Sequence, residues 1–213
     1  MNLKRTCVSL ATGLLSAALA AGVALAPRVS AQGTARPRGC NQAMADSLAF
    51  VEVPGHPFEP ILSKDGCSCF VPLISANPRS PNGVAVLRRG DGKVTVVRVI
   101  PVEPEPTGMV LTHDGKLLVV ADGDQVVFMD TARMVSGRGD PILGYISDGE
   151  NAGSVYVNCT ADDRYLFVSD EHAQAITVID LGKARGSGFQ PDAIVGKIPV
   201  GRAPIALTFS PDE

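Results

Sequence analysis

One short phrase occurs at three places in the sequence. It reads V-E-V-P-G-H-P at residues 51–57, I-P-V-E-P-E-P at 100–106 and I-P-V-G-R-A-P at 198–204. The last proline of each copy is followed eight positions later by an aspartate, and one more aspartate continues the series. Four aspartates therefore lie 49 residues apart: Asp65, Asp114, Asp163 and Asp212. A period of this size is typical of stacked supersecondary units. We interpret these aspartates as structural, each capping a tight turn through its own backbone.

The units between these phrases have a β pattern. Short β-branched runs alternate with turn residues, and no stretch of twelve residues has an apolar period of 3.6. The runs I-L-G-Y-I at 142–146 and I-V-G-K-I at 194–198 are the same strand in two successive units. The predicted strands are 67–73, 84–87 and 94–99, then 107–112, 116–121, 125–130 and 142–146, then 155–160, 165–169, 175–180 and 194–198.

A four-stranded antiparallel meander cannot bury both of its faces alone, whereas units arranged radially bury them against each other. The sequence therefore predicts an all-β fold, a partial β-propeller over residues 48–213 with about three blades and the start of a fourth. The expected units are 54–102, 103–147, 148–200 and 201–213. Leu48–Val53 matches the outer strand that precedes the repeated proline. We expect an incomplete ring from a truncated or incompletely assembled gene product; the alternative is a ring closed by several copies.

Two segments resemble the YVTN-type repeat of seven-bladed propellers. They are V-G-R-A-P-I-A-L-T-F-S-P-D-E at 200–213 and A-D-D-R-Y-L-F-V-S-D at 161–170, the latter followed by the I-T-V-I-D strand at 176–180. The resemblance is strong over residues 100–213 and weak at 66–90, and Asp170 stands where the motif often has Asn. It implies a lactonase-like or surface-antigen-type propeller.

The first 31 residues have the features of a secretory signal peptide. Lys4 and Arg5 precede an apolar run rich in small residues, and Val29-Ser30-Ala31 suits a signal peptidase. A membrane span is the weaker alternative, because the run is rich in Ala, Gly and Ser. Residues 32–47 are predicted to be a linker. We expect a secreted or periplasmic protein with no membrane span after cleavage.

Charge and composition exclude one class of partner. The net charge of −3, the absence of Trp and 5% aromatic residues give neither the basic field nor the stacking surface that nucleic acid requires. Four cysteines follow the predicted signal peptide: Cys40, Cys67, Cys69 and Cys159. They are either small buried hydrophobic residues or include one disulfide that tethers the Cys40 segment to the first sheet.

Meander topology sends most of the unusual polar residues to one face of the propeller. The blade-to-blade loops and the loops between second and third strands share this face, where several blades converge on one axis. The catalytic candidates are His56, Glu105 and His172; the ligand-binding candidates are Glu103, Glu150, Asn151 and Arg202. Glu105, Glu150 and Asp170, with Asn151, could hold Ca²⁺ or another hard cation. The alternative for each residue is an ordinary polar turn.

The sequence has no catalytic motif, so the first functional hypothesis is an exported scaffold that binds a small molecule or protein at its loop face. The alternative is a lactone hydrolase of the 6-phosphogluconolactonase or gluconolactonase type, with a histidine as base and, in one version, a metal that polarises the carbonyl. No cofactor is otherwise expected. An electron-transfer propeller with haem is the third hypothesis, disfavoured because C-x-x-C-H is absent.

Overall fold

The computed structural model describes Cys40, residues 43–44, 47–75, 77, 80 and 82–212. All of these belong to one compact unit, Arg36–Glu213. The predicted signal peptide, residues 1–31, and most of the predicted linker, residues 32–47, lie outside the described residues. No helix in the described part of the chain has both the length and the apolar character needed to cross a membrane.

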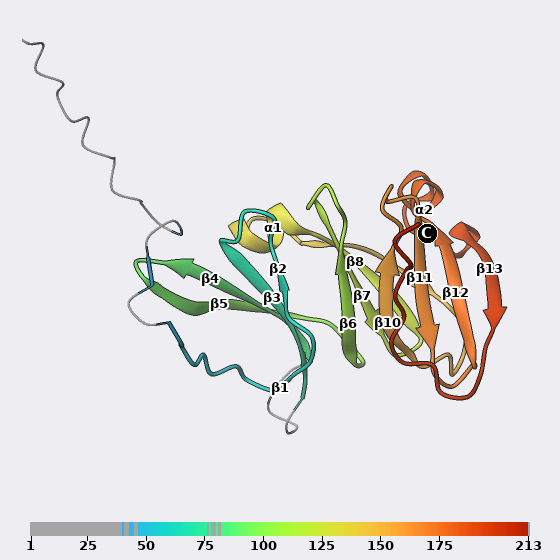
Figure 1. Ribbon diagram of the computed structural model, residues 1–213, viewed down its shortest axis with the longest axis horizontal. Helices are drawn as coiled ribbons and strands as arrows, with labels where there is room; N and C mark the ends of the chain where they lie inside the picture. The colour runs from blue at the N-terminus through green and yellow to red at the C-terminus, as the bar shows by residue number, and fades with distance from the viewer. Residues whose placement is uncertain are drawn as a thin grey trace, which may run out of the picture. The chain divides into compact units, whose positions relative to one another are not determined.

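Three antiparallel sheets follow one another along the chain (Figure 1). The first contains β1 (His56–Pro57), β2 (Ile61–Leu62), β3 (Ser68–Ile74), β4 (Gly83–Gly90) and β5 (Lys93–Pro101). The second contains β6 (Pro106–Leu111), β7 (Leu117–Asp122), β8 (Gln125–Asp130) and β9 (Ile142–Ser147). The third contains β10 (Ser154–Cys159), β11 (Tyr165–Asp170), β12 (Ala175–Asp180) and β13 (Ile194–Pro199). In the first sheet β1 and β2 both pair with β3, so all three sheets have four strand positions in meander order.

The sheets pack face to face. One apolar cluster joins the first two sheets through Phe70, Leu118 and Met129, and a second joins the last two sheets through Phe128 and Leu166. All six residues of β7 are buried, because this strand has a neighbouring sheet on each face. The outer strands β9 and β13 are largely exposed. Stacked four-stranded antiparallel blades confirm the predicted class, an all-β partial propeller.

The segment Leu48–Val53 does not form the expected outer strand. Its residues have no strand pairing in the described structure, and Val51 and Val53 instead pack against a small cluster that includes Val71 and Leu73. A strand forms only when its backbone pairs with the edge of another strand, and the residues of this segment make no such pairs. Val51 and Val53 are therefore used for packing, whereas Leu48 and Phe50 of the same segment are exposed.

The segment 201–212 also differs from its prediction, because it contains no strand. It packs on the third sheet: the hydroxyl of Ser169 donates to the carbonyl of Ile205 at 2.5 Å, and the rings of Phe167 and Phe209 meet edge to face at 5.1 Å. The expected first strand of a fourth unit has no second strand beside it among the described residues.

Two short helices, which the sequence analysis did not predict, connect the third and outer strands of the last two blades. They are α1 (Thr131–Ser136) and α2 (Leu181–Ser187), and a 3-10 turn, η2 (Pro191–Ala193), follows α2. The carboxylates of Asp130 and Asp180 cap their first turns, and Gly137 and Gly188 end them in the left-handed conformation. Helices of six and seven residues are too short to display a 3.6-residue period.

The repeated turns share one hydrogen-bond pattern. An aspartate accepts a bond from the hydroxyl two residues before it and from the backbone N–H two residues after it. The trios are Ser63, Asp65 and Cys67; Thr112, Asp114 and Lys116; and Thr160, Asp162 and Arg164. Asp212 accepts from Ser210 in the same way. These bonds lower the pKa of each aspartate.

The third turn corrects the predicted register. Asp162 makes the capping bonds, so it and not Asp163 is equivalent to Asp65 and Asp114. Asp163 has φ = 56° and occupies the position of Gly66 in the first turn, where the backbone is also left-handed. The 49-residue spacing therefore selected Asp163, whereas the residue that caps the turn is its neighbour Asp162.

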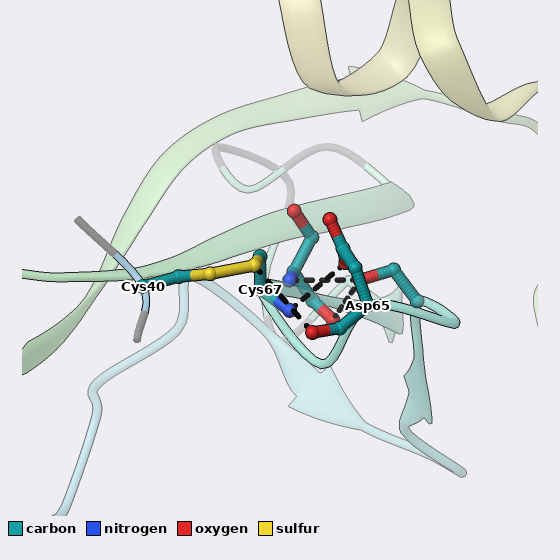
Figure 2. Close-up of a disulfide and its surroundings, with 5 residues drawn as sticks. Cys40, Asp65 and Cys67 are labelled. Carbon is teal, nitrogen blue, oxygen red and sulfur yellow. Dashed lines mark hydrogen bonds between the residues drawn. A yellow bond between two sulfur atoms is a disulfide. The ribbon is translucent and has the colours of Figure 1, made fainter. Parts of the chain in front are cut away.

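A disulfide between Cys40 and Cys67 joins the segment before the first blade to the turn that leads into β3. Figure 2 shows this bond beside Asp65, whose carboxylate accepts from the backbone N–H of Cys67 at 3.0 Å. The tether interpretation of the cysteines is thereby confirmed. Cys69 is half-buried and Cys159 is buried, as the alternative expected for small apolar residues.

Candidate functional site

Loops of the second and third blades are joined at one edge of their sheets by the carboxylate of Asp124. This residue lies in the turn between β7 and β8, and it accepts bonds from the backbone N–H groups of Asn151 at 3.0 Å and Gly153 at 3.2 Å. The Asn151 and Gly153 amides lower the pKa of Asp124, which keeps it ionised. The blade-to-blade loop is thus held in one conformation.

A second carboxylate fixes the loop that leads into the second blade. Asp122 ends β7 and is fully buried; it accepts from the backbone N–H of Glu105 at 2.7 Å and from the side-chain amide of Gln125 at 2.8 Å. Burial raises the pKa of Asp122 despite these bonds. The backbone at Glu105 is therefore held in place, and its side chain extends from a fixed position.

His172 lies against the same loop of the third blade. Its backbone N–H donates to the carbonyl of Ala152 at 3.1 Å, and Glu171 donates to the carbonyl of Gly153 at 2.8 Å. Gly153 has φ = 69°, and a Cβ at this position would lie 2.7 Å from Nδ1 of His172. A glycine is required here both for the turn and for the imidazole beside it.

These loops enclose a cavity of about 480 Å³, here called the loop-face cavity. Its wall combines Phe58 and Ile74 of the first blade, Glu105 and Thr107 of the second, and residues of the third blade that include Asn151, Ser154 and His172. Two cavities of about 530 Å³ lie elsewhere, both beside Cys40 and Arg88. We take the loop-face cavity as the candidate site because residues from all three blades line it.

The structure brings together some of the predicted residues. Glu105, Asn151 and His172 line the loop-face cavity, and Arg202 lines an adjoining hollow of about 350 Å³ that shares Asn151 and His172. An imidazole, a carboxylate and an amide thus face one volume, with a guanidinium beside it. This combination can bind a polar ligand and move a proton.

The other predicted ligand and catalytic residues do not line this cavity. His56 is exposed in β1, where it pairs with Ile74. Glu103 accepts a bond from the side-chain amide of Asn82 at 2.7 Å, and Glu150 is exposed. The copy of the repeated phrase at 100–106 thus supplies Pro104 and Glu105 to the cavity wall, whereas the histidine of the first copy, His56, does not line it.

Asp170, which was predicted as a metal ligand, does not line the cavity and is buried in a polar cluster. Its carboxylate accepts from the hydroxyl of Thr177 at 2.5 Å and lies 3.4 Å from Nζ of Lys197. Ser154 donates to Asp148, and Ser154 Oγ also lies 3.5 Å from Asp170 Oδ1. A cation that bound Asp170 would have to compete with the ammonium group of Lys197.

Asp148 is a buried acid of this cluster whose ionisation is disfavoured. Burial raises the pKa of Asp148 to about 7. The hydrogen bond from Ser154 lowers this pKa, and the nearby charge of Asp170 raises it further. Two carboxyl groups that share a buried site favour one proton between them. Asp148 was not among the residues predicted for the site.

Lys197 was not predicted to contribute to the site, although the repeat contains a pattern that could have indicated it. It occupies the same position in I-V-G-K-I as Tyr145 does in I-L-G-Y-I, so the outer strand changes from aromatic to cationic between blades. Its Nζ also donates to the carbonyl of Asp148. The meeting of β13 with a loop 49 residues earlier depends on the sheet register, which the sequence pattern alone does not give.

The predicted cation ligands Glu105, Glu150 and Asp170 do not form a group in the structure. Among the described residues, one set of three His, Cys or acidic side chains has ligand atoms all within 4.8 Å of one another, namely His113, Cys159 and Asp163. That set lies at the other end of β6 and β10, away from the loop-face cavity.

No protein-family model and no curated protein matches the sequence. Solved structures do match. The periplasmic gluconolactonase PpgL of Pseudomonas aeruginosa is similar with a TM-score of 0.60 and 24% identity, over 76% of this chain and 49% of that chain. Hydrazine synthase of Kuenenia stuttgartiensis follows with a TM-score of 0.58 and 22% identity, over 79% of this chain and 42% of its own. A proposed 6-phosphogluconolactonase of Bacteroides fragilis has a TM-score of 0.56 and 16% identity, over 73% and 42%.

These similarities establish the fold, a β-propeller like those of the gluconolactonase and 6-phosphogluconolactonase structures. The chain spans about half the length of the solved structures that it matches. Because different functions share one propeller fold, the activity must be argued from the site.

Proposed function

We propose that this protein is a lactone hydrolase of the propeller type, acting on a sugar lactone at the loop-face cavity. The observation that carries the proposal is the meeting of Glu105, Asn151 and His172 around one volume, with Arg202 beside it. Similarity in fold to a gluconolactonase supports this function over a pure binding scaffold. A volume of about 480 Å³ is large enough for a sugar ring.

The chemistry requires a base and a donor. In the proposed reaction the imidazole of His172 takes a proton from water as the water oxygen attacks the lactone carbonyl. The amide of Asn151 or the guanidinium of Arg202 donates to the carbonyl oxygen as it gains negative charge. The bond to the ring oxygen then breaks, and this oxygen takes the proton from the imidazolium, which gives the hydroxy acid.

Glu105 can act in this reaction in either of two ways. Its carboxylate can accept a bond from a sugar hydroxyl and orient the ring. It can also join Asn151 and Glu171, which line the same cavity, as an oxygen ligand for Ca²⁺. Assays with EDTA and with added Ca²⁺ separate these two ways, because a purely orienting carboxylate leaves the rate unchanged by chelation.

The full-length protein is tested by following acid release from glucono-1,5-lactone at constant pH. We expect His172→Ala to lower kcat/KM by at least about 100-fold, the lower range for loss of a general base. His56→Ala is the matched control, since His56 is exposed outside the cavity, and it is expected to retain activity. Equal losses in both variants, or no lactone turnover by the wild-type protein, would contradict the proposal.

The second candidate function is a scaffold that binds a sugar acid or a peptide without turnover. The observation that favours it is that Asp122 and Asp124 use their carboxylates to hold loops, which gives a preformed wall. Calorimetry with gluconate and glucono-1,5-lactone distinguishes the two functions. Binding in wild type, weakened by Glu105→Gln and accompanied by no hydrolysis, would favour the scaffold.

Membership of the YVTN-repeat family and export from the cytoplasm are further parts of this proposal. The Cys40–Cys67 disulfide supports export, because such bonds persist in oxidising compartments. The charged and apolar start of the sequence supports it independently. Cell fractionation with sequencing of the mature N-terminus tests it: cleavage after Ala31 is expected, and retention of residues 1–31 on a cytoplasmic protein would contradict it.

A further inference from the structure

At the seam between the second and third blades, three metal-ligating side chains meet at the end opposite the loop-face cavity. His113 comes from the turn between β6 and β7, Cys159 ends β10, and Asp163 lies in the turn between β10 and β11. Nδ1 of His113 is 2.7 Å from Oδ1 of Asp163, and Sγ of Cys159 is 3.8 Å from that nitrogen and 3.6 Å from that oxygen. We call these three residues the seam cluster.

Each member of the seam cluster departs from the pattern of the chain's own repeat. The position of His113 is occupied in the other units by Lys64, Ala161 and Pro211. The position of Asp163 is occupied by Gly66, Gly115 and Glu213, and that of Cys159 by Leu62, Leu111 and Phe209. Repeat packing therefore does not require a histidine or a cysteine at these places, and two units have glycine in place of the acid, yet the three side chains meet at one seam.

We propose that the seam cluster is a binding site for a single Zn²⁺ ion that joins the second blade to the third. Imidazole nitrogen, thiolate sulfur and carboxylate oxygen are the ligands that zinc takes in tetrahedral sites. Three protein ligands leave the fourth position for water, and His113, whose side chain is 56% exposed, gives access from solvent. Cys159 is 3% exposed, which shields the metal–sulfur bond on the inner side.

The separations of the ligand atoms fit this ion with one adjustment. Zinc–ligand bonds of about 2.0–2.3 Å at tetrahedral angles place sulfur about 3.6 Å from nitrogen and oxygen, and nitrogen about 3.3 Å from oxygen. The two distances that involve sulfur, 3.8 and 3.6 Å, already agree. The nitrogen–oxygen distance of 2.7 Å is that of a hydrogen bond, so this pair must open by roughly 0.6 Å around the ion.

Binding exchanges protons for metal. The thiol of Cys159 loses its proton to solvent. The imidazole of His113, whose Nδ1 donates to Asp163 without the ion, releases the Nδ1 proton to solvent and takes one on Nε2, so that Nδ1 presents a lone pair. Asp163 presents Oδ1, the oxygen that already faces the backbone N–H and the ring of His113. Its second oxygen keeps the backbone N–H of Asp114, 3.3 Å away, as an orienting partner.

The alternative is that the seam cluster is only a hydrogen-bonded clamp between blades. Asp163 Oδ1 accepts from the backbone N–H of His113 at 2.8 Å in addition to the ring nitrogen. In that case substitution of His113 lowers stability, but no ion binds. Metal titration separates the two cases because a clamp has no spectroscopic signature.

The experiment is a titration of the full-length protein with Co²⁺ under argon without reductant, followed by competition with Zn²⁺. We expect one equivalent of Co²⁺ to produce thiolate-to-cobalt charge-transfer absorption that Zn²⁺ abolishes. Cys159→Ser and His113→Ala should each weaken Zn²⁺ binding by at least about 100-fold, the upper range for loss of a merely supporting residue. Cys69→Ser is the matched control and should bind as wild type does.

Three outcomes would overturn the zinc site. They are no stoichiometric binding of either ion, binding without the charge-transfer absorption, and binding that Cys159→Ser leaves unchanged. Circular dichroism and melting of each variant establish folding. If the buried Cys159→Ser variant does not fold, the exposed substitution His113→Gln decides, and Zn²⁺ should raise the melting temperature of wild type but not of this variant.

Discussion

Asp148 is the residue at which pH acts most directly on the fold. Its pKa of about 7 in the folded protein lies well above the ordinary value of 3.8. The folded state therefore holds this proton more tightly than the unfolded chain does. Its contribution to stability is complete below about pH 4 and is lost as the pH rises through about 7.

Asp148→Asn tests this coupling. The amide keeps the shape and has no charge to bury, so we expect the variant to be more stable than wild type at pH 8, on the order of 2–4 kcal/mol, and close to wild type at pH 4. Denaturant unfolding at several pH values measures the difference. Asp192→Asn, an exposed substitution in η2, should not change the pH dependence; an Asp148→Asn variant with the wild-type pH profile would refute the assignment.

The pair Asp162 and Asp163 shows how two adjacent identical residues take different tasks. Asp162 has the hydroxyl of Thr160 at 2.6 Å and caps its own turn. Asp163, in a left-handed conformation, directs its carboxylate to His113 of the preceding blade. The first task is local and repeats with the sequence, whereas the second exists only because two blades meet.

At the scale of the element, α1 and α2 show that an all-β repeat admits helices where a connection is long. Each starts at the aspartate that ends the third strand and stops at a glycine in the left-handed region. Each buries apolar side chains, Met134 in α1 and Leu181 and Ala184 in α2. These helices connect the third and outer strands of the second and third blades.

Asp180→Ala is expected to destabilise the protein by about 1 kcal/mol, because it removes the N-cap of α2. The bond that is lost runs from the backbone N–H of Lys183 to Asp180 Oδ1 at 2.9 Å. Lys183→Ala is the matched control, since it keeps that N–H, and it should change the free energy of unfolding by less than about 0.5 kcal/mol. Equal effects of the two substitutions in denaturant titrations would exclude the cap as the cause.

At the scale of the whole molecule, the contact between neighbouring blades decides stability. The inner strands β6 and β10 approach closely at Gly108, where a Cβ would lie 2.7 Å from Cα of Tyr156 and 2.7 Å from the carbonyl oxygen of Val155. Both atoms belong to the backbone and cannot rotate away. The second and third blades can pack at this distance only because residue 108 has no side chain.

Gly108→Ala should therefore separate these blades and destabilise the protein by roughly 1–3 kcal/mol, as overpacking does in well-packed cores. Gly196→Ala is the matched control, because nothing lies within 4 Å of a Cβ at that position in β13. Thermal and chemical unfolding measure both variants. If Gly108→Ala unfolds like Gly196→Ala, the close approach of the two strands has no energetic importance.

Much of the fold could be predicted from the sequence. Runs such as Q-V-V-F-M-D at 125–130 and A-I-T-V-I-D at 175–180 correspond residue for residue to β8 and β12. Alternation, turn residues and their repetition are local signals, and strands follow local signals when a partner is nearby in sequence. The strands predicted at 48–53 and 201–212 did not form, because strand pairing also requires a neighbouring edge, which local sequence does not specify.

The site was predictable to a lesser degree. Meander topology correctly put Glu105, Asn151 and His172 on one face, because loops alternate between the two ends of a sheet. It could not exclude His56, nor indicate that Lys197 and Asp148 would surround Asp170. Those contacts depend on the register of the third sheet and on the path of the loop that leads into it.

The sequence by itself determined the period, the order of the strands and the polarity of each loop, because these depend on neighbours along the chain. Only the tertiary structure decided which polar groups share a volume, which carboxyl group loses its solvent, and that His113, Cys159 and Asp163 meet at one seam. Burial and coordination depend on distances between residues that lie about 50 positions apart, and the packing of one blade on the next sets those distances.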